Sequence, residues 1–160
     1  TGVQTCALPI CSLYTVWKRT APMPNMIAFD AGSREVCIAR RQTTSTPLQA
    51  FVLLNDPQFV EAARVLAERT LKADSKSDKE RVESLFLRLA SRALSPTETR
   101  LLLDLLASQK EMFQKETEQA QKLLHVGASK PDETLSPADL AALTIVTQTI
   151  LNLDATIWRR

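Results

Sequence analysis

Four prolines, each preceded by a side chain that can cap a helix, constrain the fold of this chain more than any other feature. They occur in the pairs Thr46-Pro47, Asp56-Pro57, Ser95-Pro96 and Ser136-Pro137. Proline is well tolerated at the first position of a helix, where its missing N–H has no helical partner. A Ser, Thr or Asp just before it can accept a hydrogen bond from the first turn. Each pair therefore predicts the start of a helix.

Apolar residues recur at helical spacing after each of these starts and after Ser77, which begins a further capping-box pattern with Glu80. We predict five helices, at 47–54, 57–73, 78–93, 96–126 and 137–158. In the last of them the apolar positions alternate three- and four-residue steps, as in a packed helix seam: Leu143, Val146, Ile150, Leu153 and Ile157. Short connections make successive helices antiparallel, so we expect an all-α fold, a small bundle of about five helices.

Two parts of this bundle have polar sequences. The fourth helix turns polar from Gln109 onward, and we expect its second half to project into solvent. The segment 127–135, which contains Gly127 and Pro131, is expected to be a mobile loop.

The residues before the first of the five helices divide into two segments. Residues 1–10, TGVQTCALPI, resemble the translated read-through of a common sequencing adaptor, and we treat 1–11 as an artefactual tail. Residues 12–46 are expected to form an extended, irregular arm of the same domain, followed by the helical domain at 47–160. We expect the whole chain to be a C-terminal fragment of a larger protein, with any export signal in the missing upstream part.

Few standard catalytic constellations can be assembled from these residues. His125 is the only histidine, which excludes a His-based triad and a two-His metal site within the chain. Cys37 is the only cysteine outside the tail, and no C-x-x-C-H haem attachment is present. The formal net charge of +2 is too balanced to predict nucleic-acid binding, and no run approaches the roughly 18 apolar residues of a membrane span.

The arm concentrates the side chains that could be functional. They are one tryptophan, one aspartate and four arginines: Trp17, Arg19, Asp30, Arg34, Arg40 and Arg41. Arginine binds carboxylate, phosphate and sulfate in a bidentate manner, and a tryptophan face can stack on a sugar. One interpretation is therefore an anion or acidic-glycan site. The other, which we favour, is that these groups pair with carboxylates of the arm and of an upstream domain, because extended chain needs side-chain partners for its backbone. In the same way we expect Gln49 and Asn55 to satisfy backbone groups of the arm.

Several short sequence motifs, in the arm and just after it, resemble a known family. They are Ser12-Leu13-Tyr14, Trp17-Lys18-Arg19-Thr20, Phe29-Asp30-Ala31, Arg34-Glu35-Val36-Cys37, Arg40-Arg41, and Thr46-Pro47-Leu48-Gln49-Ala50 leading into Leu53-Leu54-Asn55-Asp56-Pro57. Together they resemble the C-terminal domain, of unknown function, of PSD-type multidomain proteins that also carry a planctomycete-type cytochrome-c-like domain. The family commonly has Pro or Ser and then Asp after Phe29-Asp30-Ala31, whereas Gly32-Ser33 stands here, which removes a carboxylate from this turn.

The resemblance implies a non-catalytic module of an exported, extracytoplasmic protein concerned with polysaccharide or redox metabolism. The partners it implies are upstream domains of the same polypeptide and an anionic glycan, and haem is expected only in the missing part. The alternative is an enzyme active site shared with the upstream domain, in which Arg34, Arg40 and Arg41 bind a sulfated or phosphorylated substrate and Asp30 supplies acid–base or metal chemistry. Whether the chain is part of an enzyme stays open at this point.

Overall fold

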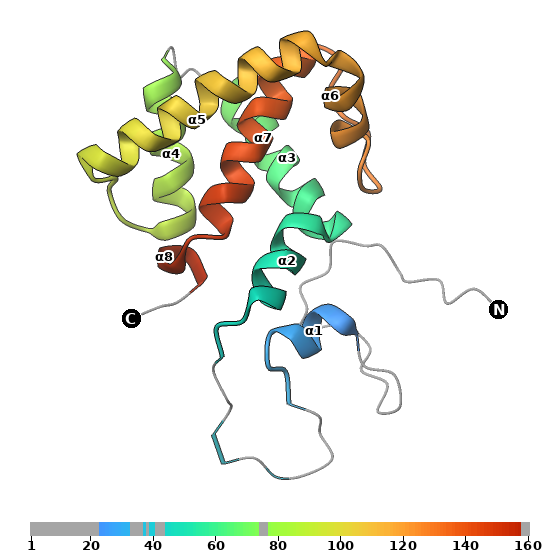
Figure 1. The fold of residues 1–160 in the computed structure, drawn as a ribbon, viewed down its shortest axis with the longest axis vertical. Coiled ribbons are helices and arrows are strands. Elements are labelled where there is room, and N and C mark those ends of the chain that lie inside the picture. The colour runs from blue at the N-terminus through green and yellow to red at the C-terminus, as the bar shows by residue number, and fades with distance from the viewer. Residues whose placement is uncertain (1–22, 33–36, 38, 41–43, 74–76, 158–160) are drawn as a thin grey trace, which may run out of the picture. The chain divides into compact units, whose positions relative to one another are not determined.

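The computed structural model describes residues 23–32, 37, 39–40, 44–73 and 77–157. Within these ranges the chain forms eight helices and no strand (Figure 1). The all-α fold predicted from the sequence is therefore confirmed. The chain divides into two units after Val52, and each unit is described by itself.

The N-terminal unit contains a helix that the sequence did not predict. α1 (Pro24–Ala28) lies inside the segment that we expected to be extended. Pro24 occupies its first turn, but Met23 before it provides no side-chain cap, so the cap–proline signal that marks the other helices is missing here. α1 is followed by Asp30, whose φ of +55° lies in the left-handed region that ends many helices. α2 (Pro47–Asn55) begins in this unit and continues past the division.

The C-terminal unit is a bundle of six helices among its described residues. They are α3 (Pro57–Lys72), α4 (Asp78–Ala90), α5 (Pro96–Lys115), α6 (Thr117–Leu124), α7 (Pro137–Leu151) and α8 (Asp154–Ile157). The predicted caps are present, since side chains of Asp56, Ser77, Ser95 and Ser136 accept hydrogen bonds from the backbone N–H groups of the following turns. Ser95 and Glu98 complete a reciprocal capping box. These caps satisfy donors that have no partner within a helix.

α7 is the central helix of this bundle, and α3, α4, α5, α6 and α8 all contact it. Figure 1 shows it in dark orange between α3 and α5. Its predicted seam is confirmed in the middle, where Leu143, Val146 and Ile150 are buried. Polar side chains are buried in the same helix because they satisfy themselves locally: Thr144 and Thr147 donate hydrogen bonds to the carbonyls of Leu140 and Leu143.

Two predicted helices are interrupted. The helix expected at 96–126 breaks at Glu116, and α6 turns back to pack against α7 instead of projecting into solvent. The expectation of a solvated second half was wrong because Ala120 and Leu124 supply an apolar stripe that the core buries. The helix expected at 137–158 ends at Leu151 and is followed by the short α8.

No helix formed by the described residues is long and apolar enough to cross a membrane.

Candidate functional site

Only part of the predicted basic site falls within the described residues. Trp17, Arg19, Arg34 and Arg41 lie outside them, as does the expected artefactual tail. The structure places Asp30 just after α1 and Arg40 on the segment that leads to α2. The two are therefore the only members of the predicted site whose surroundings can be described.

Asp30 closes the loop between α1 and α2. Its Oδ2 accepts hydrogen bonds from the Thr44 hydroxyl at 2.7 Å and from the Thr44 backbone N–H at 2.8 Å. These two bonds, the hydroxyl first, lower the pKa of Asp30 from its ordinary value. Asp30 therefore holds the two ends of the 31–43 segment together as an ionised carboxylate.

Gln49 extends this contact from the first turn of α2. Its Nε2 donates to the Thr44 hydroxyl at 3.3 Å, and its Oε1 accepts from the Thr46 backbone N–H at 3.3 Å. Gln49 is buried. The prediction that this amide satisfies backbone of the arm is confirmed, and Asp30, Thr44 and Gln49 form one hydrogen-bonded series.

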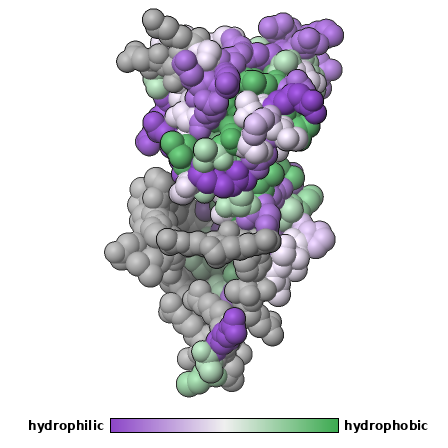
Figure 2. Space-filling model, turned by 90° about the vertical axis from the view of Figure 1, so that its left-hand side faces the viewer, coloured by the Kyte–Doolittle hydropathy of each residue, from purple (hydrophilic) through white to green (hydrophobic). Residues whose placement is uncertain are grey.

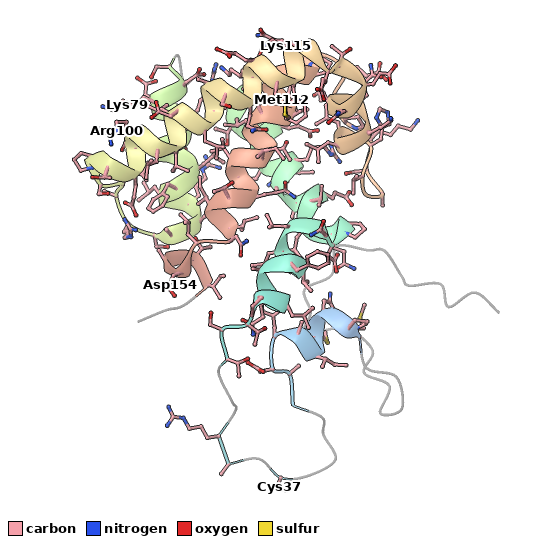
Figure 3. All side chains as sticks on the ribbon, viewed as in Figure 1. Cys37, Lys79, Arg100, Met112, Lys115 and Asp154 are labelled. Carbon is pink, nitrogen blue, oxygen red and sulfur yellow. The ribbon has the colours of Figure 1, made fainter. Side chains whose placement is uncertain are left out.

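Arg40 has a different environment. Its side chain is exposed, and no ion pair joins it to any residue that the structure describes. Cys37, a free thiol, is likewise exposed on the same segment (Figure 3). The structure thus does not bring Arg40 together with Asp30 in an ion pair.

Apolar side chains are also exposed in the N-terminal unit. Leu48 and Phe51 lie one turn apart on α2 and are 59% and 63% exposed, and Ile27 on α1 is 55% exposed. Gln49 and Leu53, which are four positions apart, are buried on another side of α2. We refer to Leu48 and Phe51 as the α2 apolar face. α2 therefore buries Leu53 but also exposes large apolar side chains, whereas the apolar side of a helix is usually buried.

Other exposed large apolar side chains are Leu54 at the end of α2, which is 44% exposed, and one leucine on each of two later helices. Leu87 on α4 and Leu101 on α5 are 57% and 58% exposed. Figure 2 shows one side of the chain, on which apolar surface in green is interrupted by hydrophilic side chains in purple. Singly exposed leucines of this kind are common on soluble proteins and carry no inference by themselves.

The most extensive polar cluster lies in the C-terminal unit and was not predicted. Arg64 on α3 is completely buried. Its guanidinium donates to the Ser129 carbonyl at 3.0 Å, to the Ser129 hydroxyl at 2.6 Å and to the Lys130 carbonyl at 3.5 Å, and it pairs with Glu68 one turn away. Arg64 therefore holds the segment between α6 and α7 against α3.

Glu61, one turn before Arg64, binds the same segment. Its carboxylate accepts hydrogen bonds from the backbone N–H groups of Ala128 at 2.9 Å and Ser129 at 2.8 Å, and from the Ser129 hydroxyl. These donors, the hydroxyl first, lower the pKa of Glu61. Gly127 makes the approach possible: its φ is +109°, and a Cβ built there would lie 2.5 Å from Glu61 Oε2.

Lys72 and Glu68 complete the cluster toward the end of α3. Lys72 pairs with Asp132, and this contact raises the pKa of Lys72 and lowers that of Asp132. Glu68 accepts from the Asp132 backbone N–H at 3.3 Å. We call the four side chains Glu61, Arg64, Glu68 and Lys72 with their partners at 128–132 the α3 latch. The segment that we expected to be a mobile loop is thus anchored by four successive charged positions on one helix face.

A second charged cluster connects three helices. Lys110 on α5 pairs with Asp78 on α4 at 2.6 Å and lies 3.6 Å from Asp139 on α7, while Arg81 pairs with Asp78 at 3.0 Å. The hydrogen bond from Lys110 is the main cause that lowers the pKa of Asp78. These groups neutralise one another, which is the arrangement of a structural ion-pair network.

Side chains able to ligate a metal do not gather in the described ranges, where no group of three His, Cys, Asp or Glu residues is found. His125 is exposed, and its Nδ1 lies 2.7 Å from the Gln121 carbonyl one turn earlier. His125 is thus an exposed residue at the C-terminal end of α6.

Comparison with known proteins gives one match. The model of a protein family described as PSD1, a protein of unknown function (DUF1553), matches residues 9–106, from before α1 into α5. No curated protein and no solved structure matches the chain.

Proposed function

We propose that this chain, which belongs to the PSD1 family of proteins of unknown function, is a non-catalytic docking module of a larger polypeptide. The α2 apolar face is the observation that carries this proposal. Leu48 and Phe51 are large apolar side chains, and each is more than half exposed. Burying a leucine or phenylalanine side chain contributes about 1.5–3 kcal/mol, so covering this face would be favourable.

The occupant that we propose for this face is an upstream domain of the same polypeptide. Two side chains are a small contact for association between separate molecules, which normally bury about 800 Å² on each partner. A domain tethered in the same chain has an effective concentration in the millimolar range, so a contact of this size is sufficient.

Charge limits the kind of surface that fits. The arm at 12–46 carries five basic residues, Lys18, Arg19, Arg34, Arg40 and Arg41, against Asp30 and Glu35. Asp30 is already engaged by Thr44, whereas Arg40 is exposed. The complementary surface would therefore be apolar at its centre and carry carboxylates at its edge.

The setting of the module follows from the family resemblance rather than from its geometry. We propose that the parent protein is exported, of planctomycete type and associated with a cytochrome-c-like domain, and that it takes part in polysaccharide or redox metabolism outside the cytoplasm. Haem would be bound by the upstream part.

The test compares the isolated chain with the longer parent protein. Leu48→Ser with Phe51→Ser removes the α2 apolar face, and Leu87→Ser with Leu101→Ser is the matched control, since all four side chains are similarly exposed. In the isolated chain both double variants should change stability little, because exposed substitutions usually cost within about 0.5 kcal/mol each. In the parent protein only the α2 variant should lower the melting temperature of the module and increase its cleavage by protease. Equal effects of the two double variants in the parent would contradict the docking proposal.

The second candidate is binding of an anionic ligand, and the exposure of Arg40 favours it. A guanidinium without an ion pair to the described residues is available for a sulfate or phosphate group. Calorimetric titration of the parent protein with inorganic sulfate and with a heparin oligosaccharide tests this candidate. Binding that is lost in Arg40→Ala at an unchanged melting temperature would support an anion site over a purely structural role.

A further inference from the structure

The connection between α5 and α6 is a single residue. Glu116 follows the last residue of α5 and precedes the first residue of α6, and its φ and ψ of −118° and 63° are not helical. Figure 3 shows Lys115 at the end of α5, where the chain turns back toward α6. The Glu116 side chain makes no capping bond to α6. The chain can therefore change direction here by rotation at one residue, as a hinge does.

Charged side chains of α3 hold the far end of this segment. Residues 128–132 are fastened to α3 by the α3 latch, in which Glu61 accepts three hydrogen bonds and Arg64 donates to two carbonyls. Ala128 and Ser129 are themselves exposed. The latch thus bears most of the attachment at this end.

Between hinge and latch, α6 packs its three apolar side chains, Ala120, Leu123 and Leu124, on the core. Its buried residues are Ala120 and Leu124, whereas most of the α7 helix that it covers is buried. Local opening free energies are lowest where few apolar side chains are buried and where backbone hydrogen bonds lie near solvent.

We propose that residues 117–134 form a strap, hinged at Glu116 and fastened by the α3 latch, which opens as one unit while α3, α4, α5 and α7 stay folded. Opening uncovers the side of α7 on which α6 packs. This is a conformational property of the helical unit, and it is independent of the docking role proposed for α2.

Hydrogen exchange of the isolated chain followed by mass spectrometry tests the strap. In the unmodified chain we expect the protection factors of the amides of 120–124 to be at least about tenfold lower than those of the central amides of α7. Glu61→Gln keeps the shape of the side chain but removes the charge that accepts three hydrogen bonds. It should reduce protection at 120–124 by a further factor of about ten and leave α4 and α7 unchanged, since a hydrogen bond to a charged group contributes about that factor.

Two further variants make the result decisive. Glu83→Gln is the matched control, because Glu83 is a 46% exposed carboxylate whose ion pair among the described residues is with Lys79, on the same helix α4, at 3.8 Å. It should leave exchange in the strap unchanged. Gly127→Ala, which pushes the backbone away from Glu61, should reproduce the Glu61→Gln pattern. The proposal is overturned if 120–124 are as protected as α7 in the unmodified chain. It is also overturned if Glu61→Gln lowers protection equally in all helices, or leaves the strap unaffected.

Discussion

Replacing Arg64 by methionine should destabilise the protein more than any other single change of a charged residue. Arg64 is completely buried, and methionine preserves much of its volume while removing the charge. Glu68, whose side chain is only 14% exposed, would lose its ion-pair partner, and the carbonyls of Ser129 and Lys130 would lose their donor. Removing one member of a buried ion pair costs about 3–5 kcal/mol.

Two features place the cost at the lower end of that range. Ser129 and Lys130 are exposed, so water can replace the guanidinium at their carbonyls. The Nε of Arg64 is buried without a hydrogen-bond partner among the described residues, and this defect disappears with the side chain. We therefore expect a loss of about 3 kcal/mol, which for a domain of this size lowers the melting temperature by roughly 12 °C.

Urea denaturation followed by circular dichroism measures this loss. Arg69→Met is the control on the same helix, because Arg69 is exposed, and it should change stability by less than about 0.5 kcal/mol. In the double variant Arg64→Met/Glu68→Met no unpaired charge remains, so the loss should be smaller than the sum of the two single losses by about 1–3 kcal/mol. Equal stabilities of Arg64→Met and Arg69→Met, or strict additivity in the double variant, would refute the description of Arg64 as a buried, paired charge.

Three further outcomes are expected. Gly127→Ala should lower the free energy of unfolding measured in urea by about 2 kcal/mol, since alanine is strained at a φ of +109°. Ser91→Gly, at a φ of +55°, should instead raise it by up to about 1 kcal/mol. A stabilising Gly127→Ala would contradict the geometry. The hydrogen bonds from Arg92, followed by that from the Ser95 backbone, lower the pKa of Glu98 from 4.5 to about 2. The contribution of Glu98 to the free energy of unfolding is therefore complete above pH 4.5 and is lost as the pH falls toward 2. Glu98→Gln should flatten the stability profile in that interval by no more than about 1 kcal/mol, because solvent screens a surface pair, and an unchanged profile would show that the pair contributes nothing. Leu143→Ala in the centre of α7 should cost about 2–5 kcal/mol, and a loss below 1 kcal/mol would argue against α7 as the core helix.

The sequence alone determined the helical class and most helix starts of this protein. Caps and apolar periodicity are local signals, which involve residues within one or two turns of each other, so they can be read without knowing the fold. Asp56, Ser77, Ser95 and Ser136 cap as predicted, and Gln49 satisfies the Thr46 backbone as predicted. Asp30 was expected to pair with arginines or to form part of a ligand site, whereas the partner that the structure gives it is Thr44. The predictions for Trp17, Arg19, Arg34 and Arg41 stay predictions.

Only the tertiary structure decided the contacts between residues that are far apart in the sequence. Glu61 and Ser129 are separated by 68 positions, and no periodicity links them. Glu61, Arg64, Glu68 and Lys72 follow one another at helical spacing, and that charged stripe was the available signal for the latch. A charged stripe on a helix usually faces water, so it could not reveal that the α6–α7 connection would cover this one. The break at Glu116 likewise could not be predicted, because no proline or glycine lies at this position. It exists because α7 offers Ala120 and Leu124 a place in the core, and only the folded chain supplies that surface.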